Sequence, residues 1–480
     1  MKRFGALILC AMLCIALVPD VYAREEILRV YNWQDYINEG KDDDGAKIAE
    51  SVIELWEEDY YERTGKRVRV QYDTFETNET MLNTLRTGKT SYDLVCPSDY
   101  VIQKMLSATL SGEDDSISIE KYDISTMTNY NRYVSPYISQ LFEKNGWTDY
   151  AVAYMWGTVG FMYNPEAVKK EDVSTWDFFW NTDYKNRATC KDVSRDAYVI
   201  GSLYAHSQEL QKAAQNYKSG KITADELQKI VNAAANDTSA ENIEEVGRVL
   251  TEMKNNIYGF EVDSGKTDIV SGKIDANLAW SGDAVYAMDL AEEEDDKELA
   301  FVIPREGSTI WFDGWVMPKG ANTALAQDFV DFLCVPEIAA MNMDYIGYTS
   351  AIAGDQIFDL VRENYEDGDG KYEYDLSYFF AGTLSEDRYD ENNRAIIRTD
   401  TIGRQLTTQY PSLDEVARCG IMEDFGDRNQ AVLEMWSVVK SNNVSAFSYV
   451  MMAVLFIMMI AMMASTIRRK TKKKRRMRRR

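Results

Sequence analysis

Strand and helix patterns of apolar residues alternate through the first part of the chain. A strand pattern starts at Ile27 and is followed by a helical face that ends near Gly65. The apolar residues of that face recur every four positions, at Ile48, Val52, Trp56 and Tyr60. Further strands are predicted at 68–72 and 92–96, with a short helix at 77–85 between them. This order predicts a parallel sheet with helices on its faces.

A loop follows the carboxyl end of each of these three predicted strands. The loops are Asn32–Tyr36, Asp73–Asn78 and Pro97–Tyr100. The carboxyl ends of parallel strands lie at one edge of a sheet, which is where such sheets bind ligands. We therefore expect the three loops to converge on one site.

A second α/β pattern begins near Tyr154 and continues to Asn255. Its strands are predicted at 161–163 and 188–190, and its helices from Ala197 onward. Residues 208–252 suggest a peripheral helical insert, and the acidic, tyrosine-rich stretch 363–393 suggests exposed surface. A chain of 480 residues with two such patterns is expected to form two or three lobes.

Both ends of the chain carry membrane-related patterns. Lys2 and Arg3, the apolar run 4–18 and the small residues before position 24 predict a signal peptide over residues 1–23. An uncleaved anchor is the alternative. Residues 446–467 contain no charge and are long enough for a transmembrane helix. They precede the tail 468–480, in which 11 of 13 residues are basic, and such tails stay in the cytoplasm.

The charge balance limits the partners. The chain has 78 acidic and 53 basic residues and a net charge of −25, although its C-terminal tail is basic. The remaining body is thus strongly acidic, which argues against nucleic acid and favours small cations. Beyond the leader, four cysteines remain, which are either paired in one of three ways or free: Cys96, Cys190, Cys334 and Cys419.

Signals for catalysis are weak. The single histidine, His206, lies in a predicted helix and is interpreted as a packed or surface residue. A Ser-His-Asp triad or a histidine-rich metal site would need it, and the chain has no phosphate-binding glycine loop. We therefore expect no enzyme activity, no metal and no cofactor.

Aromatic residues stand beside carboxylates at several predicted strand ends. Examples are Trp33 with Asp35, Asp99 with Tyr100, and Trp311 with Asp313. A ring face attracts a cation by about 0.5–2 kcal/mol, and a carboxylate adds a charged hydrogen bond. The combination suits an ammonium ligand with an apolar stem, although ordinary core packing explains any one pair.

These motifs resemble, in the same order, those of the spermidine/putrescine-binding proteins of ABC importers, an extracellular solute-binding protein family. The matching segments are 28–36 (LRVYNWQDY), 74–81 (TFETNETM), 92–100 (YDLVCPSDY), 154–158 (YMWGT), 279–282 (AWSG), 310–313 (IWFD) and 346–348 (IGY).

The resemblance implies an α/β, two-lobed periplasmic-binding-protein type II fold with a hinge. The one C-terminal transmembrane helix predicted above lies outside the family's usual pattern. Lobe one would combine residues 27–152 with 311–352, and lobe two 153–310 with 353–440.

Site residues are also implied by the resemblance. The aromatic residues around the methylene chain would be Trp33, Tyr36, Trp280, Trp311 and Tyr348. The carboxylates facing the ammonium groups would be Asp35, Asp196 and Asp313. Gln34, Ser98 and Tyr100 would supply polar contacts. Two positions depart from the family pattern: Val193 stands where an acidic residue is usual, with Asp192 one position away, and Met422 stands where a glutamine is usual, beside Glu423.

The predicted function is that of a monomeric, membrane-tethered, extracytoplasmic protein that captures a polyamine such as spermidine or putrescine and delivers it to an ABC permease. One alternative is a tethered sensor of the same fold, for another cation or a sugar. A less favoured one is a secreted carboxylate-pair hydrolase. The choice between putrescine and spermidine stays open.

Overall fold

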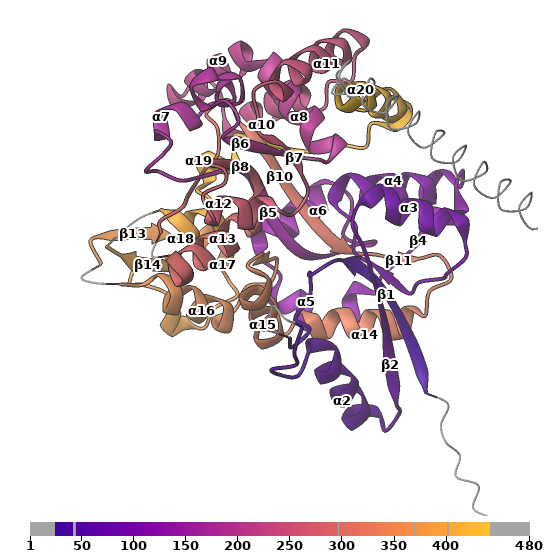
Figure 1. Ribbon diagram of the computed structural model, residues 1–480. Coiled ribbons are helices and arrows are strands. Elements are labelled where there is room, and N and C mark those ends of the chain that lie inside the picture. The colour runs from indigo at the N-terminus through magenta and orange to yellow at the C-terminus, as the bar shows by residue number, and fades with distance from the viewer. Residues whose placement is uncertain (1–24, 42–44, 296, 368–369, 401–402, 442–480) are drawn as a thin grey trace, which may run out of the picture.

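The first sheet is parallel, as predicted. The computed structural model describes residues 25–41, 45–295, 297–367, 370–400 and 403–441. Its first strands are β1 (Glu26–Trp33), β2 (Val68–Phe75) and β3 (Leu94–Val95), arranged in the order β2-β1-β3 (Figure 1). Both pairings are parallel. Their carboxyl ends therefore share one edge.

Helix α2 (Val52–Thr64) starts later than its apolar pattern predicts. Ser51 caps it, because its hydroxyl accepts from the Glu54 backbone and the Glu54 carboxylate accepts from the Ser51 backbone. Ile48 lies outside the helix and is 69% exposed, so the predicted apolar face is wrong at its first position. Gly65 ends the helix as expected, with a left-handed φ of 69°.

Further helices and a small ladder complete this part of the molecule. The ladder pairs β4 (Ile119–Glu120) with β11 (Met317–Pro318). The helices are α3 (Asn78–Thr87), α4 (Asp99–Ser111), α5 (Thr128–Tyr133), α6 (Pro136–Lys144), α14 (Thr323–Leu333) and α15 (Pro336–Ile346). Trp56 of α2 has no exposed surface, and its indole donates to Asp328 of α14 at 2.9 Å.

Two strands of the second sheet, β5 (Val152–Tyr163) and β10 (Ser308–Trp315), lie next to the first sheet and its helices. β5 is buried along its whole length and pairs antiparallel with β10. Val316, just after β10, bridges Val95 of β3. The second sheet has the order β15-β10-β5-β8-β6-β7, and β9 and β12 also pair with β5. Its other strands are β6 (Ala188–Lys191), β7 (Gly259–Glu261), β8 (Ala276–Trp280), β9 (Ala300–Val302), β12 (Thr349–Ser350) and β15 (Cys419–Ile421).

Helices gather at the end of the molecule opposite β1, β2 and α2 (Figure 1). They are α7 (Lys170–Val173), α8 (Ser194–Ala205), α9 (Ser207–Lys218), α10 (Ala224–Ala235), α11 (Ala240–Lys254) and α20 (Asn429–Ser441). Next to the second sheet lie α12 (Gly265–Val270) and α13 (Ser281–Asp295). The helices predicted from Ala197 onward are thus confirmed, whereas the lobe boundaries stay a prediction.

The stretch 363–393 is more buried than its composition suggests. It includes the end of α16 (Asp355–Tyr365), β13 (Tyr372–Asp375) and α17 (Ser377–Phe380). Leu376, Phe379 and Phe380 have no exposed surface, because α17 packs its rings against Trp156 and Tyr410. The prediction of exposed surface is wrong for these residues. The last elements are β14 (Ile396–Thr399), α18 (Arg404–Gln409) and α19 (Leu413–Val416).

The predicted signal peptide (1–23), transmembrane helix (446–467) and basic tail (468–480) lie outside the described residues. Within the part that is described, no helix has both the length and the apolar character to cross a membrane. Of the two readings for the cysteines at 96, 190, 334 and 419, the structure shows free thiols, all of them buried.

Candidate ligand-binding site

The predicted convergence of the loops is confirmed by two buried asparagines. Asn78 opens α3, and its amide donates to the Ser98 hydroxyl at 3.1 Å and to the Tyr100 hydroxyl at 3.0 Å. Asn32 donates to the hydroxyl of Tyr72 in β2 at 3.0 Å. One amide thus joins the second and third loops, and the other holds the first loop to β2.

Asp313 lies at the centre of the site with one oxygen unused. The Tyr36 hydroxyl donates to Asp313 Oδ2 at 2.7 Å. The Asp313 backbone forms an antiparallel β-bridge with Ser98. Its Oδ1 is buried and has no hydrogen-bond partner among the described residues. Burial raises the pKa of Asp313 to about 6, although the Ser98 side chain and the Tyr36 hydroxyl oppose the shift. A buried carboxylate oxygen in this state is suited to accept a hydrogen bond from a cation.

Aromatic rings surround this carboxylate. The ring of Tyr348 lies 5.1 Å from that of Tyr36, edge to face, and 5.7 Å from that of Trp311. Gly157 of β5 makes room for Trp311, because a Cβ there would lie 2.6 Å from the indole ring. Gly282 does the same for Tyr348, whose ring would be 2.3 Å from an added Cβ. Two glycines therefore make room for the rings beside Tyr36, which binds Asp313.

Asp196 and Trp280 form a second pair. Asp196 lies in the first turn of α8, Trp280 ends β8, and the Trp280 indole donates to the Asp196 carboxylate. Burial raises the pKa of Asp196 to about 6, although Lys191, this hydrogen bond and Arg195 oppose the shift. The site therefore holds two buried carboxylates, each beside an aromatic residue.

The first loop also carries the three remaining predicted residues. Trp33 is half-buried with its ring 4.6 Å from that of Phe75. Gln34 and Asp35 are exposed and hydrogen-bonded to each other at 3.4 Å. Asp35 has a left-handed φ of 51°. The contacts above therefore join six of the predicted residues into one group and Asp196 with Trp280 into a separate pair, whereas Trp33, Gln34 and Asp35 are linked to the group through the loop alone.

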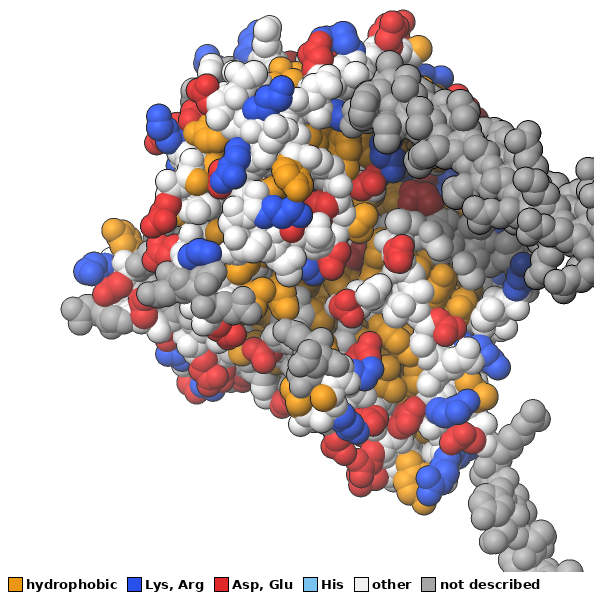
Figure 2. Space-filling model, in the orientation of Figure 1, with side chains coloured by type: hydrophobic (Ala, Val, Ile, Leu, Met, Phe, Trp, Pro, Cys, Tyr) orange, Lys and Arg blue, Asp and Glu red, His pale blue; other side chains and the backbone are white. Residues whose placement is uncertain are grey.

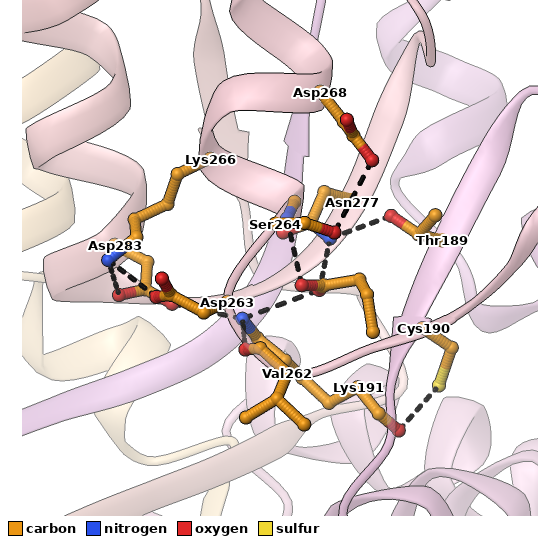
Figure 3. A network of polar contacts seen from close by, with 12 residues as sticks. Thr189, Cys190, Lys191, Val262, Asp263, Ser264, Lys266, Asp268, Asn277 and Asp283 are labelled. Carbon is orange, nitrogen blue, oxygen red and sulfur yellow. Dashed lines mark hydrogen bonds and ion pairs between the residues drawn. The ribbon is translucent and has the colours of Figure 1, made fainter. Parts of the chain in front are cut away.

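A buried lysine beside Trp280 was missed by the sequence prediction. Lys191 ends β6, and its ammonium lies 4.4 Å from the centre of a Trp280 ring. The same ammonium lies 3.0 Å from Asp283 Oδ2 (Figure 3). Asp283 also accepts a 2.8 Å hydrogen bond from Tyr348. The signal for Lys191 was present, since it directly follows the predicted strand 188–190 at its carboxyl end.

Comparison with known proteins identifies the family. Residues 57–355 match the model of the bacterial extracellular solute-binding proteins. The chain belongs to this family. As a member of a family of solute-binding proteins, it is not an enzyme, as predicted.

Individual relatives of the binding protein agree with this assignment. The spermidine/putrescine-binding periplasmic protein of Salmonella typhimurium is 26% identical over 72% of this chain and 84% of its own length. The putrescine-binding periplasmic protein SpuD of Pseudomonas aeruginosa is 27% identical over 74% of this chain and 86% of its own.

A solved structure is similar in fold. The spermidine/putrescine ABC transporter substrate-binding protein PotD of Streptococcus pneumoniae has a TM-score of 0.55 at 22% identity, over 87% of this chain and 99% of its own. The α/β fold of the binding protein is therefore confirmed.

The positions at which the binding protein departs from the family pattern carry no charge into the site. Asp192 pairs with Lys440 of α20 at 2.7 Å. The Met422 carbonyl accepts from the Gln103 amide at 2.9 Å. Arg195, next to Asp196, lies over the Tyr100 ring at 4.3 Å and donates to the Glu423 carbonyl at 2.6 Å. These contacts hold α4, α8 and the segment after β15 together.

The surface of the binding protein shows apolar side chains toward the middle of one face, with charged side chains around them (Figure 2). A cavity of about 480 Å³ lies apart from the predicted site. Its lining includes Tyr163, Phe301 and Arg418. No group of three or more possible metal ligands occurs within the described ranges.

Proposed function

We propose that this binding protein captures a linear polyamine, such as putrescine or spermidine, outside the cytoplasm. The observation that carries the proposal is the buried Asp313 oxygen without a partner, surrounded by Tyr36, Trp311 and Tyr348. Such an oxygen can accept from an ammonium group, while the rings contact its methylene chain. The names of the relatives support the same ligand class.

Each predicted residue has a role in this proposal. Asp313 and Asp196 bind ammonium groups, and Trp280 holds Asp196 in position through its indole. Asp35, on the exposed part of the first loop, adds a third carboxylate. The remaining contacts come from Trp33, Gln34, Tyr36, Ser98, Tyr100, Trp311 and Tyr348.

The capture of ligand is proposed to close two lobes. Residues 27–152 with 311–352 form one lobe, and 153–310 with 353–440 form the other. By these bounds the chain crosses between the lobes at the start of β5, within β10 and shortly after β12, and bending at these crossings provides the hinge. Arg195 of the second lobe already lies over the Tyr100 ring of the first, at 4.3 Å.

The binding protein is proposed to act as a tethered monomer. The signal peptide 1–23 directs export, the helix 446–467 anchors the chain in the membrane, and the tail 468–480 stays in the cytoplasm. The tether keeps the ligand-binding part close to an ABC permease, to which the polyamine is delivered.

Titration calorimetry on the full chain in mild detergent tests the ligand class. Putrescine, spermidine and spermine are compared with arginine and with a panel of neutral sugars. We expect micromolar or tighter binding of at least one polyamine and none of the sugars. The absence of polyamine binding, or tighter binding of a sugar, would overturn the proposal.

A further inference from the structure

Lys191 is a fully buried cation that is held by several partners. Its side chain is 1% exposed, and its ammonium donates to the Val262 carbonyl at 2.8 Å and to Asp283 at 3.0 Å. A Glu261 carboxylate oxygen lies 3.4 Å away. Burial alone would lower the pKa of Lys191, but Asp283 and Glu261 raise it. The ammonium therefore stays charged inside the protein.

This ammonium occupies one face of a ring that is assigned to the ligand. Lys191 Nζ lies 4.4 Å from the centre of a Trp280 ring, within the range of a cation–π contact. The Trp280 indole in turn donates to Asp196. The protein thus places its own cation where a ligand ammonium near Trp280 would otherwise lie.

The carboxylates around Lys191 are already matched by cations. Asp283 is bound by Lys191, by the Tyr348 hydroxyl at 2.8 Å and by Lys266 at 3.7 Å. Glu261 accepts from the Gly265 backbone at 2.8 Å and from the Asn277 amide at 2.9 Å. Two lysines therefore balance two buried carboxylates here, whereas Asp313 retains a free oxygen.

We propose that Lys191 is a specificity-determining residue that restricts the ligand to a diamine. A lysine side chain is four methylenes ending in an ammonium, which is the aminobutyl group found in longer polyamines. Lys191 fills the end of the site between Trp280 and Asp283 with this group. A triamine would have to place its third ammonium there, against a cation of the same charge. This inference rests on the proposed function, because it takes Trp280 and Asp196 as part of the ligand site.

Lys191→Ala tests the restriction. Calorimetry with putrescine and spermidine gives the ratio of the two dissociation constants for the wild-type chain and the variant. In the variant, Lys266 still lies 3.7 Å from Asp283, Glu261 loses the ammonium of Lys191, and the removed side chain leaves room for an aminoalkyl arm. We expect the ratio to shift toward spermidine by at least about tenfold, the scale of one lost charge pair.

A double variant provides the matched control. Lys191→Ala combined with Asp283→Asn removes both members of the closer pair, so the carboxylate that remains is Glu261, which the Gly265 backbone and the Asn277 amide still bind. Its ratio should return toward that of the wild type. A ratio within twofold of the wild type in Lys191→Ala would overturn the assignment of Lys191. Failure of the wild type to bind either polyamine would instead overturn the proposed function.

Chemical rescue separates the assignment from a loss of folding. The atoms missing in Lys191→Ala are those of n-propylamine, and 1-propanol is the uncharged control. We expect n-propylamine at millimolar concentration to raise the melting temperature of the variant, or to permit its refolding, with no such effect from 1-propanol. Equal effects of the two compounds, or none, would show that Lys191 does not occupy a site for an alkylammonium group.

Discussion

The Tyr36 hydroxyl donates a 2.7 Å hydrogen bond to Asp313, a residue 277 positions further along the chain. Tyr36 follows β1, and Asp313 lies in β10, where the register with β5 shifts between Asp313 and Gly314. Such an irregularity redirects a side chain relative to a regular strand. The bond therefore joins the loop that follows β1, in the first sheet, to strand β10 of the second sheet.

Asp313→Asn should weaken polyamine binding strongly. The amide keeps an oxygen for the Tyr36 hydroxyl but loses the negative charge that would face a ligand ammonium. We expect the dissociation constant for putrescine to rise at least about 30-fold, or about 2 kcal/mol. Calorimetry measures the change, with Glu391→Gln at an exposed position as the control. An equal loss in both variants would show that Asp313 does not contact the ligand.

Stability without ligand should depend on pH through Asp313 and Asp196. Burial raises both pKa values to about 6, whereas an unfolded aspartate titrates near 3.9. Between these values the folded state binds more protons, so the contribution of these two carboxyls to stability is greatest below about pH 4 and falls as the pH rises to about 6. Each carboxyl is expected to contribute on the order of 2 kcal/mol to the fall.

Urea denaturation of the ligand-free chain measures this dependence. Asp313→Asn removes one of the two carboxyls. The free energy of unfolding of the variant minus that of the wild type should therefore increase by about 2 kcal/mol from pH 4 to pH 6. Stability curves that stay parallel over this range would contradict the raised pKa of Asp313.

The first sheet and much of the site could be predicted from local patterns. Leu28 and Val30 alternate with polar residues in β1, and Thr77 caps α3 through the Thr80 backbone. Parallel strand order then places the loops at one edge of the first sheet. The contacts of Asn78 with Ser98 and Tyr100 agree with this prediction. The apolar spacing also predicts Ile48 in α2, because spacing alone does not reveal that Ser51 caps the helix.

The partners of Lys191 could not be predicted in this way. Its carboxylates, Glu261 and Asp283, lie 70 and 92 positions away, and they meet it only because β6, β7 and α13 pack together. Composition also failed for Phe379 and Phe380, which lie in an acidic stretch but are fully buried. A charge or an acidic segment does not by itself indicate exposure.

Removal of residues 446–480 should release the protein from the membrane. The uncharged stretch 446–467 is long enough to cross a bilayer, and no other tether is proposed for the mature chain. We expect the full chain in the membrane fraction and the truncated chain in the soluble extracytoplasmic fraction. A variant that lacks only residues 468–480 is the control and should stay in the membrane. A truncated chain that still sediments with membranes would contradict the tether.

Gly157→Ala should damage the site through packing. An added Cβ would lie 2.6 Å from the Trp311 ring and 2.3 Å from the Ser281 hydroxyl, so the ring or the strand must move. We expect a loss of about 1–3 kcal/mol in the free energy of unfolding, together with weaker polyamine binding, because Trp311 shifts away from Tyr348.

Gly259→Ala is the matched control for this substitution. Gly259 is also a strand glycine, in β7, and an added Cβ there meets no atom within 4 Å. Urea denaturation should show a change of at most about 0.5 kcal/mol, and calorimetry should show unchanged binding. Equal effects of the two substitutions would mean that a general preference for glycine in strands, and not the position of Trp311, requires Gly157.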